Sequence, residues 1–243
     1  MKVILNPKYP ELKPLAEHVE RHFQGSSRVL HNQRNEIRIV SFAGNDFVVK
    51  AFRKPNFINR FVYRFFRPSK AKRSYEYSLK IGEDLCPEAI AYIEEHKGLQ
   101  LFKSYYISKY FDYDFEIREV LLDKQCENRE QILQEFVAFT YGLHQQNILH
   151  RDYSPGNILI KKRADRYLFK IVDVNRMQFK ALSLEDRLGN FVRLAKDDET
   201  MQTIIIHYAT CMNRSFEEML VIARKLRASY VEKRALKNKL RGR

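Results

Sequence analysis

The sequence contains few cysteines and no long apolar run. Its three cysteines, Cys86, Cys126 and Cys211, lie far apart and lack the close spacing of a zinc site. We therefore expect reduced thiols, as in a cytosolic protein. No segment approaches the roughly 20 consecutive apolar residues of a membrane-spanning helix. The apolar stretch after Met1 is also too short for the core of a signal peptide. A soluble protein or one bound to a membrane surface is expected.

Acidic residues are outnumbered by basic ones, with 30 Asp and Glu against 44 Lys and Arg. The 243 residues carry a formal net charge of +14 and a pI near 9.6. Such an excess indicates an anionic partner, which could be a nucleic acid, a membrane surface or a phosphorylated substrate. Residues 224–243 contain a single acid, Glu232, among many Lys and Arg residues. This tail is either a solvated basic helix or an anchor for an anionic surface.

Residues 53–73 contain Lys and Arg but no acid at all. Phe57, Phe61 and Phe65 recur every four residues, with Arg60 and Arg64 on an adjoining helical face. A basic amphipathic helix of this kind can bind an anionic bilayer, and its arginines can bind an acidic substrate. The alternative is a Phe stripe that packs into the protein core and leaves the basic face solvated.

The hydrophobic pattern changes along the chain. Alternating apolar residues predict strands at residues 28–31, 38–42, 47–52, 89–94, 101–108, 157–161 and 167–172. A period near 3.6 predicts helices at residues 11–23, 69–81 and 129–146. The chain is helical again from about Leu184, and a capping box of Ser215 and Glu218 begins a last helix. Five of the seven strands therefore lie in the first half of the chain, and the second half is mainly helical.

A polar loop at residues 148–160 carries the strongest motif. His150, Arg151 and Asp152 are followed by Asn157 in the H-R-D-x-x-x-x-N spacing of the protein-kinase catalytic loop. In that loop the Asp accepts the proton of the attacking hydroxyl and the Asn binds Mg²⁺. The sequence predicts these roles for Asp152 and Asn157, with His150 ordering the loop. The alternative is a polar loop that matches the motif by chance.

Two further residues fit the same order of motifs. Lys50, in an apolar strand, matches the lysine that binds the α- and β-phosphates of ATP, and Asp173 ends a strand where kinases place a second Mg²⁺ ligand. Glu76 is the candidate ion-pair partner of Lys50. The alternatives are a lysine on an edge strand that faces solvent and an aspartate that only ends a strand.

Several kinase features are missing. The loop at residues 32–35, which would cover the nucleotide phosphates, has no glycine, so Arg34 and Asn35 would have to bind them. Asp173 is followed by Val174 and Asn175 in place of Phe and Gly, and no A-P-E sequence follows. A regulated activation segment is therefore not expected. Arg176 is close enough in sequence to contact a phosphate or Asp152.

These residues resemble the bacterial lipopolysaccharide kinases that phosphorylate Kdo or heptose in the inner core. The likeness rests on the strings at residues 173–177, 153–160 and 54–73, and it extends over about residues 2–240. It implies an α+β, two-lobed protein-kinase-like fold, with an antiparallel-sheet lobe at residues 1–108 and a mainly helical lobe at residues 109–243.

The resemblance also implies an activity and a location. ATP and Mg²⁺ would be the cofactors, and a lipid-linked acidic sugar the acceptor. The protein would be peripheral, at the cytoplasmic face of the inner membrane. Three alternatives stay open: a kinase for another small-molecule or protein acceptor, a membrane-associated pseudokinase, and a nucleic-acid-binding protein. We expect no nucleic acid, because no known nucleic-acid motif is present.

Overall fold

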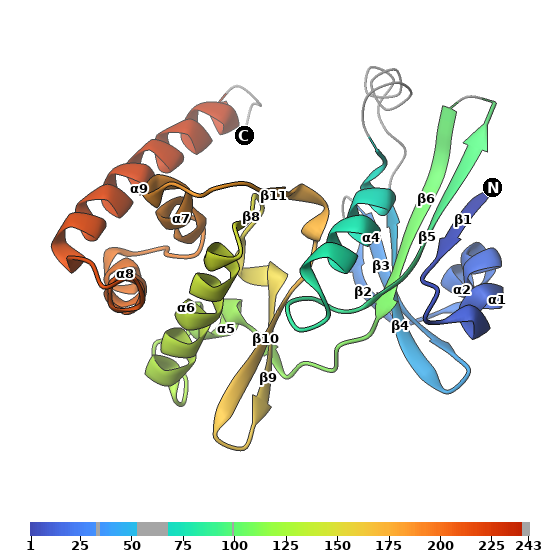
Figure 1. Ribbon diagram of the computed structural model, residues 1–243, viewed down its shortest axis with the longest axis horizontal. Coiled ribbons are helices and arrows are strands. Elements are labelled where there is room, and N and C mark those ends of the chain that lie inside the picture. The colour runs from blue at the N-terminus through green and yellow to red at the C-terminus, as the bar shows by residue number, and fades with distance from the viewer. Residues whose placement is uncertain (33–34, 53–67, 99, 240–243) are drawn as a thin grey trace. The chain divides into compact units, whose positions relative to one another are not determined.

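The chain folds into two compact units. The computed structural model describes residues 1–32, 35–52, 68–98 and 100–239 (Figure 1). The first unit comprises residues 1–112 together with 172–175, and the second comprises residues 113–171 and 176–243. Residues 53–67, which include most of the basic aromatic stretch, lie outside the described residues.

The first unit is built on a six-stranded antiparallel sheet in the order β1-β5-β6-β4-β3-β2. Its strands are β1 (Lys2–Leu5), β2 (Val29–Asn32), β3 (Asn35–Phe42), β4 (Asn45–Phe52), β5 (Ala89–Lys97) and β6 (Gln100–Lys109). The predicted strands of this half are all present. Their alternating apolar residues place one set of side chains on each face of the sheet.

Helices cover both faces of this sheet (Figure 1). Val49 and Ile107 belong to a core formed with α1 (Lys13–Glu17) and α2 (Val19–Gly25), which follow a short 3₁₀ turn, η1 (Pro10–Leu12). Phe52 and Tyr92, on the opposite face, pack against α4 (Lys70–Ile81). Lys50 precedes Phe52 by two residues, so alternation places it on the α4 face.

The long N-terminal helix predicted at residues 11–23 is broken. His18 lies between α1 and α2 with φ −112° and ψ 28°, outside the helical region. The second predicted helix is observed as α4. The side chain of Ser69 caps its N-terminus by accepting a hydrogen bond from the Lys72 amide at 3.0 Å.

The second unit is mainly helical. Its helices are α5 (Ile117–Leu122), α6 (Arg129–Gln145), α7 (Leu184–Phe191), α8 (Asp198–Met212) and α9 (Phe216–Lys239). Its strands are β7 (Phe115–Glu116), β8 (Ile148–His150), β9 (Ile158–Arg163), β10 (Arg166–Ile171) and β11 (Met177–Phe179). They form a β10-β9-β7 sheet and a β11-β8 pair. The buried side chains of α6, among them Ile132, Phe136 and Leu143, follow the predicted helical period.

Across the described parts of the chain, no helix combines the length and the apolar character needed to cross a membrane. The longest, α9, carries charged residues throughout, and all of its residues from 231 to 239 are exposed.

The β3–β4 hairpin provides a test of backbone strain. Its two central residues, Ala43 and Gly44, have φ angles of 47° and 75°, as a tight two-residue hairpin turn requires. Alanine tolerates this region poorly because its Cβ crowds the backbone. We expect Ala43→Gly to raise the free energy of unfolding by about 0.5–1 kcal/mol, measured by urea denaturation.

Gly44→Ala is the matched control in the same turn. It introduces the unfavourable Cβ at the second position and should lower the free energy of unfolding by about 1 kcal/mol. A stabilising Gly44→Ala, or a destabilising Ala43→Gly, would contradict the left-handed conformation of this turn.

Candidate functional site

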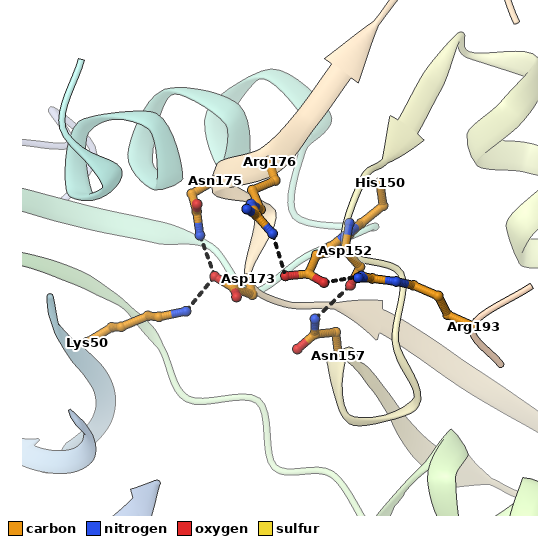
Figure 2. A network of polar contacts seen from close by, with 8 residues as sticks. All are labelled: Lys50, His150, Asp152, Asn157, Asp173, Asn175, Arg176 and Arg193. Atoms are coloured by element: carbon orange, nitrogen blue, oxygen red, sulfur yellow. Dashed lines mark hydrogen bonds and ion pairs between the residues drawn. The ribbon is translucent and has the colours of Figure 1, made fainter. Parts of the chain in front are cut away.

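Lys50 is a buried cation on β4. Its residue is 8% exposed, and it lies opposite Ile37 of β3 and Tyr106 of β6 in the sheet. Its ammonium forms an ion pair with Oδ1 of Asp173 at 2.5 Å (Figure 2). A buried ammonium without a partner would cost several kcal/mol, so this pair compensates for the burial of Lys50.

Asp173 is held in an unusual backbone conformation. Its φ angle is 58°, in the left-handed region that few residues other than Gly, Asn and Asp adopt. The Nδ2 group of Asn175 donates a second hydrogen bond to the same Oδ1 that Lys50 contacts. Residues 172–175 belong to the first unit, so Lys50, Asp173 and Asn175 form one polar group within it.

The predicted partner of Lys50 requires a correction. Glu76 is exposed on α4 and pairs with Lys72 one helical turn earlier, at 3.6 Å. Helix α4 turns Ala71, Tyr75 and Ser78 toward the sheet, and this leaves Glu76 on its outer side. The ion-pair partner of Lys50 in this structure is therefore Asp173 and not Glu76.

The residues that were predicted to bind the nucleotide phosphates and the acidic substrate are only partly described. Asn32 ends β2 and Asn35 begins β3, opposite Phe52, so Asn35 is part of a strand. Arg34, Arg60 and Arg64 lie outside the described residues.

The segment at residues 148–160 lies in the second unit and comprises β8, a loop at residues 151–157 and the start of β9. A 3₁₀ turn, η2 (Pro155–Asn157), supplies the turn that Pro155 and Gly156 predict. The Asn157 amide donates to the Ser154 carbonyl at 2.9 Å. The Asn157 side chain donates through Nδ2 to the Asp152 carbonyl at 2.8 Å. These two hydrogen bonds join Asn157 to Ser154 and Asp152 across the loop. The side-chain oxygen of Asn157, Oδ1, is then the amide atom that can act as a metal ligand.

His150 and Arg151 have different surroundings. His150 is 1% exposed, and its Nδ1 accepts the Asp152 backbone N–H at 3.1 Å. Nδ1 therefore carries no proton, which fits a residue that orders the loop. Arg151 is exposed, and its guanidinium contacts Oε1 of Gln178 at 3.4 Å. Its backbone N–H donates to the Arg176 carbonyl.

Asp152 is held by two arginines (Figure 2). Arg176 contacts Oδ2 at 3.3 Å, as its place in the sequence suggested. Arg193, which follows α7, donates to Oδ1. Sequence reasoning missed Arg193 because it lies far along the chain and belongs to no recognised motif.

Buried hydrogen bonds connect the loop to three helices. The Oγ1 of Thr140 on α6 and the hydroxyl of Tyr153 are 2.8 Å apart, and both are buried. A second chain runs from the Tyr208 hydroxyl to His144 Nδ1 at 2.6 Å, and from His144 Nε2 to Asn190 Oδ1 at 3.1 Å. Asn190 Nδ2 then donates to the His150 carbonyl at 3.2 Å. These contacts fix the backbone on both sides of Arg151 and Asp152.

No protein-family model and no curated protein sequence matches this chain. By contrast, 1650 chains of known structure resemble it, so its fold is widespread and does not by itself define an activity. The antiparallel sheet of the first unit and the mainly helical second unit make up a protein-kinase-like fold, so the fold class predicted from the sequence is confirmed.

One of the similar structures is that of WaaP, solved in complex with acyl carrier protein. The likeness covers 98% of this chain and 99% of the WaaP chain, with a TM-score of 0.58 and 14% sequence identity. At that identity the comparison establishes a shared fold, and the chemistry has to be argued from the residues themselves.

His144 makes the stability of the second unit dependent on pH. Burial lowers its pKa to about 4, although its hydrogen bond to Asn190 acts in the opposite direction. In the unfolded chain it titrates near 6.5, so between pH 6.5 and 4 the unfolded state binds a proton that the folded state does not. This contribution is absent above pH 6.5, and acidification through that window destabilises the fold by up to about 3 kcal/mol.

We expect His144→Gln to remove that part of the pH dependence. Urea unfolding of both proteins at pH 7.5, 6 and 5 would show the stability of wild type falling more steeply than that of the variant. Parallel curves would contradict a buried neutral His144.

Proposed function

We propose that this chain is an ATP-dependent phosphotransferase that phosphorylates a sugar hydroxyl, of Kdo or heptose, in the inner core of lipopolysaccharide. The observation that carries the proposal is the Asp152 loop. Its carboxylate is oriented by two guanidinium groups and its backbone by Asn157 and His150, within a protein-kinase-like fold. The acceptor class comes from the resemblance of residues 54–73, 153–160 and 173–177 to the lipopolysaccharide kinases, and the shared fold with WaaP is compatible with it.

In this proposal Asp152 accepts the proton of the attacking hydroxyl. His150 orders the loop through its Nδ1, and Arg151 flanks the site from its exposed position. Phosphoryl transfer requires positioning and charge neutralisation more than covalent chemistry. The buried hydrogen bonds that fix this loop to α6 and α7 would therefore increase the rate mainly by positioning Asp152.

Lys50, Asn157 and Asp173 are the residues that would bind the nucleotide and its metal ion. Carboxylate and amide oxygens are the ligand types that Mg²⁺ takes, and Asp173 and Asn157 supply one of each. Mg²⁺ would neutralise the charge of the transferring phosphate. Lys50 would bind the α- and β-phosphates, and its present partner Asp173 keeps its ammonium ordered.

The membrane supplies the acceptor in this proposal. A lipid-linked sugar acid lies at an anionic surface, and a net charge of +14 favours attachment to the cytoplasmic face of that membrane. Residues 53–73 are the proposed contact, with Arg60 and Arg64 on their basic face. The alternative is a pseudokinase, which would bind the same surface without transferring phosphate. The lack of glycine in the predicted phosphate loop is the feature that favours this alternative.

Radiolabelled ATP tests this function. The purified full chain would be incubated with lipid A precursors bearing Kdo or heptose, and in parallel with protein and aminoglycoside acceptors. Label in one of the lipopolysaccharide precursors supports the proposal. ATP binding without transfer to any acceptor would identify a pseudokinase, and label only in another acceptor would change the substrate class.

Asp152→Asn tests the proposed base while keeping the shape of the side chain. We expect turnover to fall by about 10²–10⁴-fold, because the amide cannot accept the hydroxyl proton. ATP affinity, measured by a fluorescent nucleotide analogue, should change little. A variant that still transfers phosphate at a near-normal rate would remove Asp152 from this role.

Charge reversal at Arg60 and Arg64 tests the membrane contact. We expect the Arg60→Glu, Arg64→Glu protein to sediment much less with anionic liposomes, because each basic residue near such a surface contributes about 1 kcal/mol. Arg163→Glu with Arg166→Glu, two exposed arginines of the β9–β10 hairpin, is the control of equal charge. Equal sedimentation of both double variants would leave the packing interpretation of the Phe stripe.

A further inference from the structure

Arg193 is the one group at Asp152 to which neither sequence motif nor resemblance gives a role. Its Nη1 donates to Oδ1 of Asp152, while Arg176 contacts the other carboxylate oxygen (Figure 2). The two guanidinium groups come from different segments, one after α7 and one immediately before β11. Both therefore depend on the tertiary structure of the second unit to reach the same carboxylate.

The charges of this cluster do not balance. Two guanidinium cations share a single carboxylate, and among the described residues no second carboxylate forms an ion pair with either of them. Arg193 also interacts with the ring and the hydroxyl of Tyr230, and the ring centroid is 5.8 Å from the guanidinium carbon. The cluster therefore keeps an excess of one positive charge, and an anion is the ligand that would neutralise it.

The cluster is both accessible and ordered. The Arg193 side chain is 35% exposed and that of Arg176 is 57% exposed, so a ligand can reach both. Tyr230 lies on α9, which packs against α7, and its ring lies beside the Arg193 guanidinium. Such support reduces the side-chain entropy that Arg193 would lose on binding.

We propose that Arg193 is an acceptor-binding residue that exchanges Asp152 for an anionic group of the acceptor. In the free protein Arg193 occupies Oδ1 of Asp152. When an acceptor with a carboxylate or phosphate beside its reactive hydroxyl binds, that anion pairs with Arg193, and Oδ1 turns to the hydroxyl. A neutral acceptor cannot make the exchange. This inference rests on the proposed phosphotransferase function and specifies how the acceptor is recognised.

The transfer step balances with the groups already named. The acceptor oxygen forms a bond to the γ-phosphorus of ATP, while the bond from that phosphorus to the β–γ bridging oxygen breaks. ADP leaves with the electron pair of that bond. The hydroxyl proton moves to Oδ1 of Asp152 and later to water. Arg193 stays protonated throughout and keeps its ion pair with the acceptor anion.

A pair of acceptors that differ in one charge provides the test. The first is a Kdo-bearing lipid A precursor, and the second is the same molecule with the Kdo carboxylate converted to its methyl ester. Wild type should use the acid about 10–100-fold better in kcat/KM, the range expected for one charge-assisted hydrogen bond. Arg193→Gln should lose this preference, mainly through a higher KM for the acid. Arg214→Gln, an exposed arginine between α8 and α9, should keep it.

The outcomes separate the two proposals. If Arg193→Gln still prefers the acid as strongly as wild type does, Arg193 does not bind the acceptor anion, although the enzyme is a kinase. If wild type phosphorylates neither of these acceptors nor a heptose-bearing precursor, the proposed function fails. Inorganic phosphate then decides the role of Arg193: the Nε–Hε signal of Arg193 in an NMR titration should shift in wild type. An unchanged signal would overturn the anion site.

Tyr230→Phe is a second variant, designed to keep the fold intact. It retains the ring beside Arg193 but removes the hydroxyl with which Arg193 also interacts. We expect a partial loss of the preference for the acid, smaller than that of Arg193→Gln. A preference unchanged from wild type would show that Tyr230 does not position Arg193.

Discussion

The polar contacts of the second unit centre on the Asp152 carboxylate, which is held by ion pairs that a ligand can replace. Its oxygens contact two arginines, and its backbone N–H and carbonyl are bound by His150 and Asn157. Both carboxylate oxygens and both backbone polar groups of Asp152 are therefore engaged. A carboxylate that is ordered in this way loses little conformational entropy when a ligand binds.

Support for this carboxylate extends well beyond its contacts. Buried polar groups are satisfied in pairs from α8 through α6 and α7 to the His150 carbonyl. Because a buried donor or acceptor without a partner is costly, each link of this chain fixes the next. His144 can serve only as a neutral ring, and its lowered pKa reflects the same burial. The same burial that orders the loop therefore makes the folded state less stable at acidic pH.

The first unit also contains a charged side chain, Lys50, whose burial is compensated by an ion pair. Lys50 lies in an apolar sheet whose other residues on that face pack against α4, and it is tolerated there because Asp173 provides the opposite charge. Asp173 adopts a left-handed backbone, and such conformations persist mainly where the surrounding structure enforces them. Lys50 and Asp173 lie more than a hundred residues apart in the sequence, yet they belong to one compact unit.

The sequence by itself determined the strands of the sheet, helices α4 and α6, and the loop with Asp152 and Asn157. Local periodicity and short motifs encode these features, because neighbours in sequence are also neighbours in a strand, a helical turn or a tight loop. Only the tertiary structure decided the ion pairs. In it Lys50 forms an ion pair with Asp173, Glu76 lies on the outer side of α4, and Arg193 forms an ion pair with Asp152. Such contacts depend on helix rotation and on segments distant in the chain meeting, and no local pattern records either.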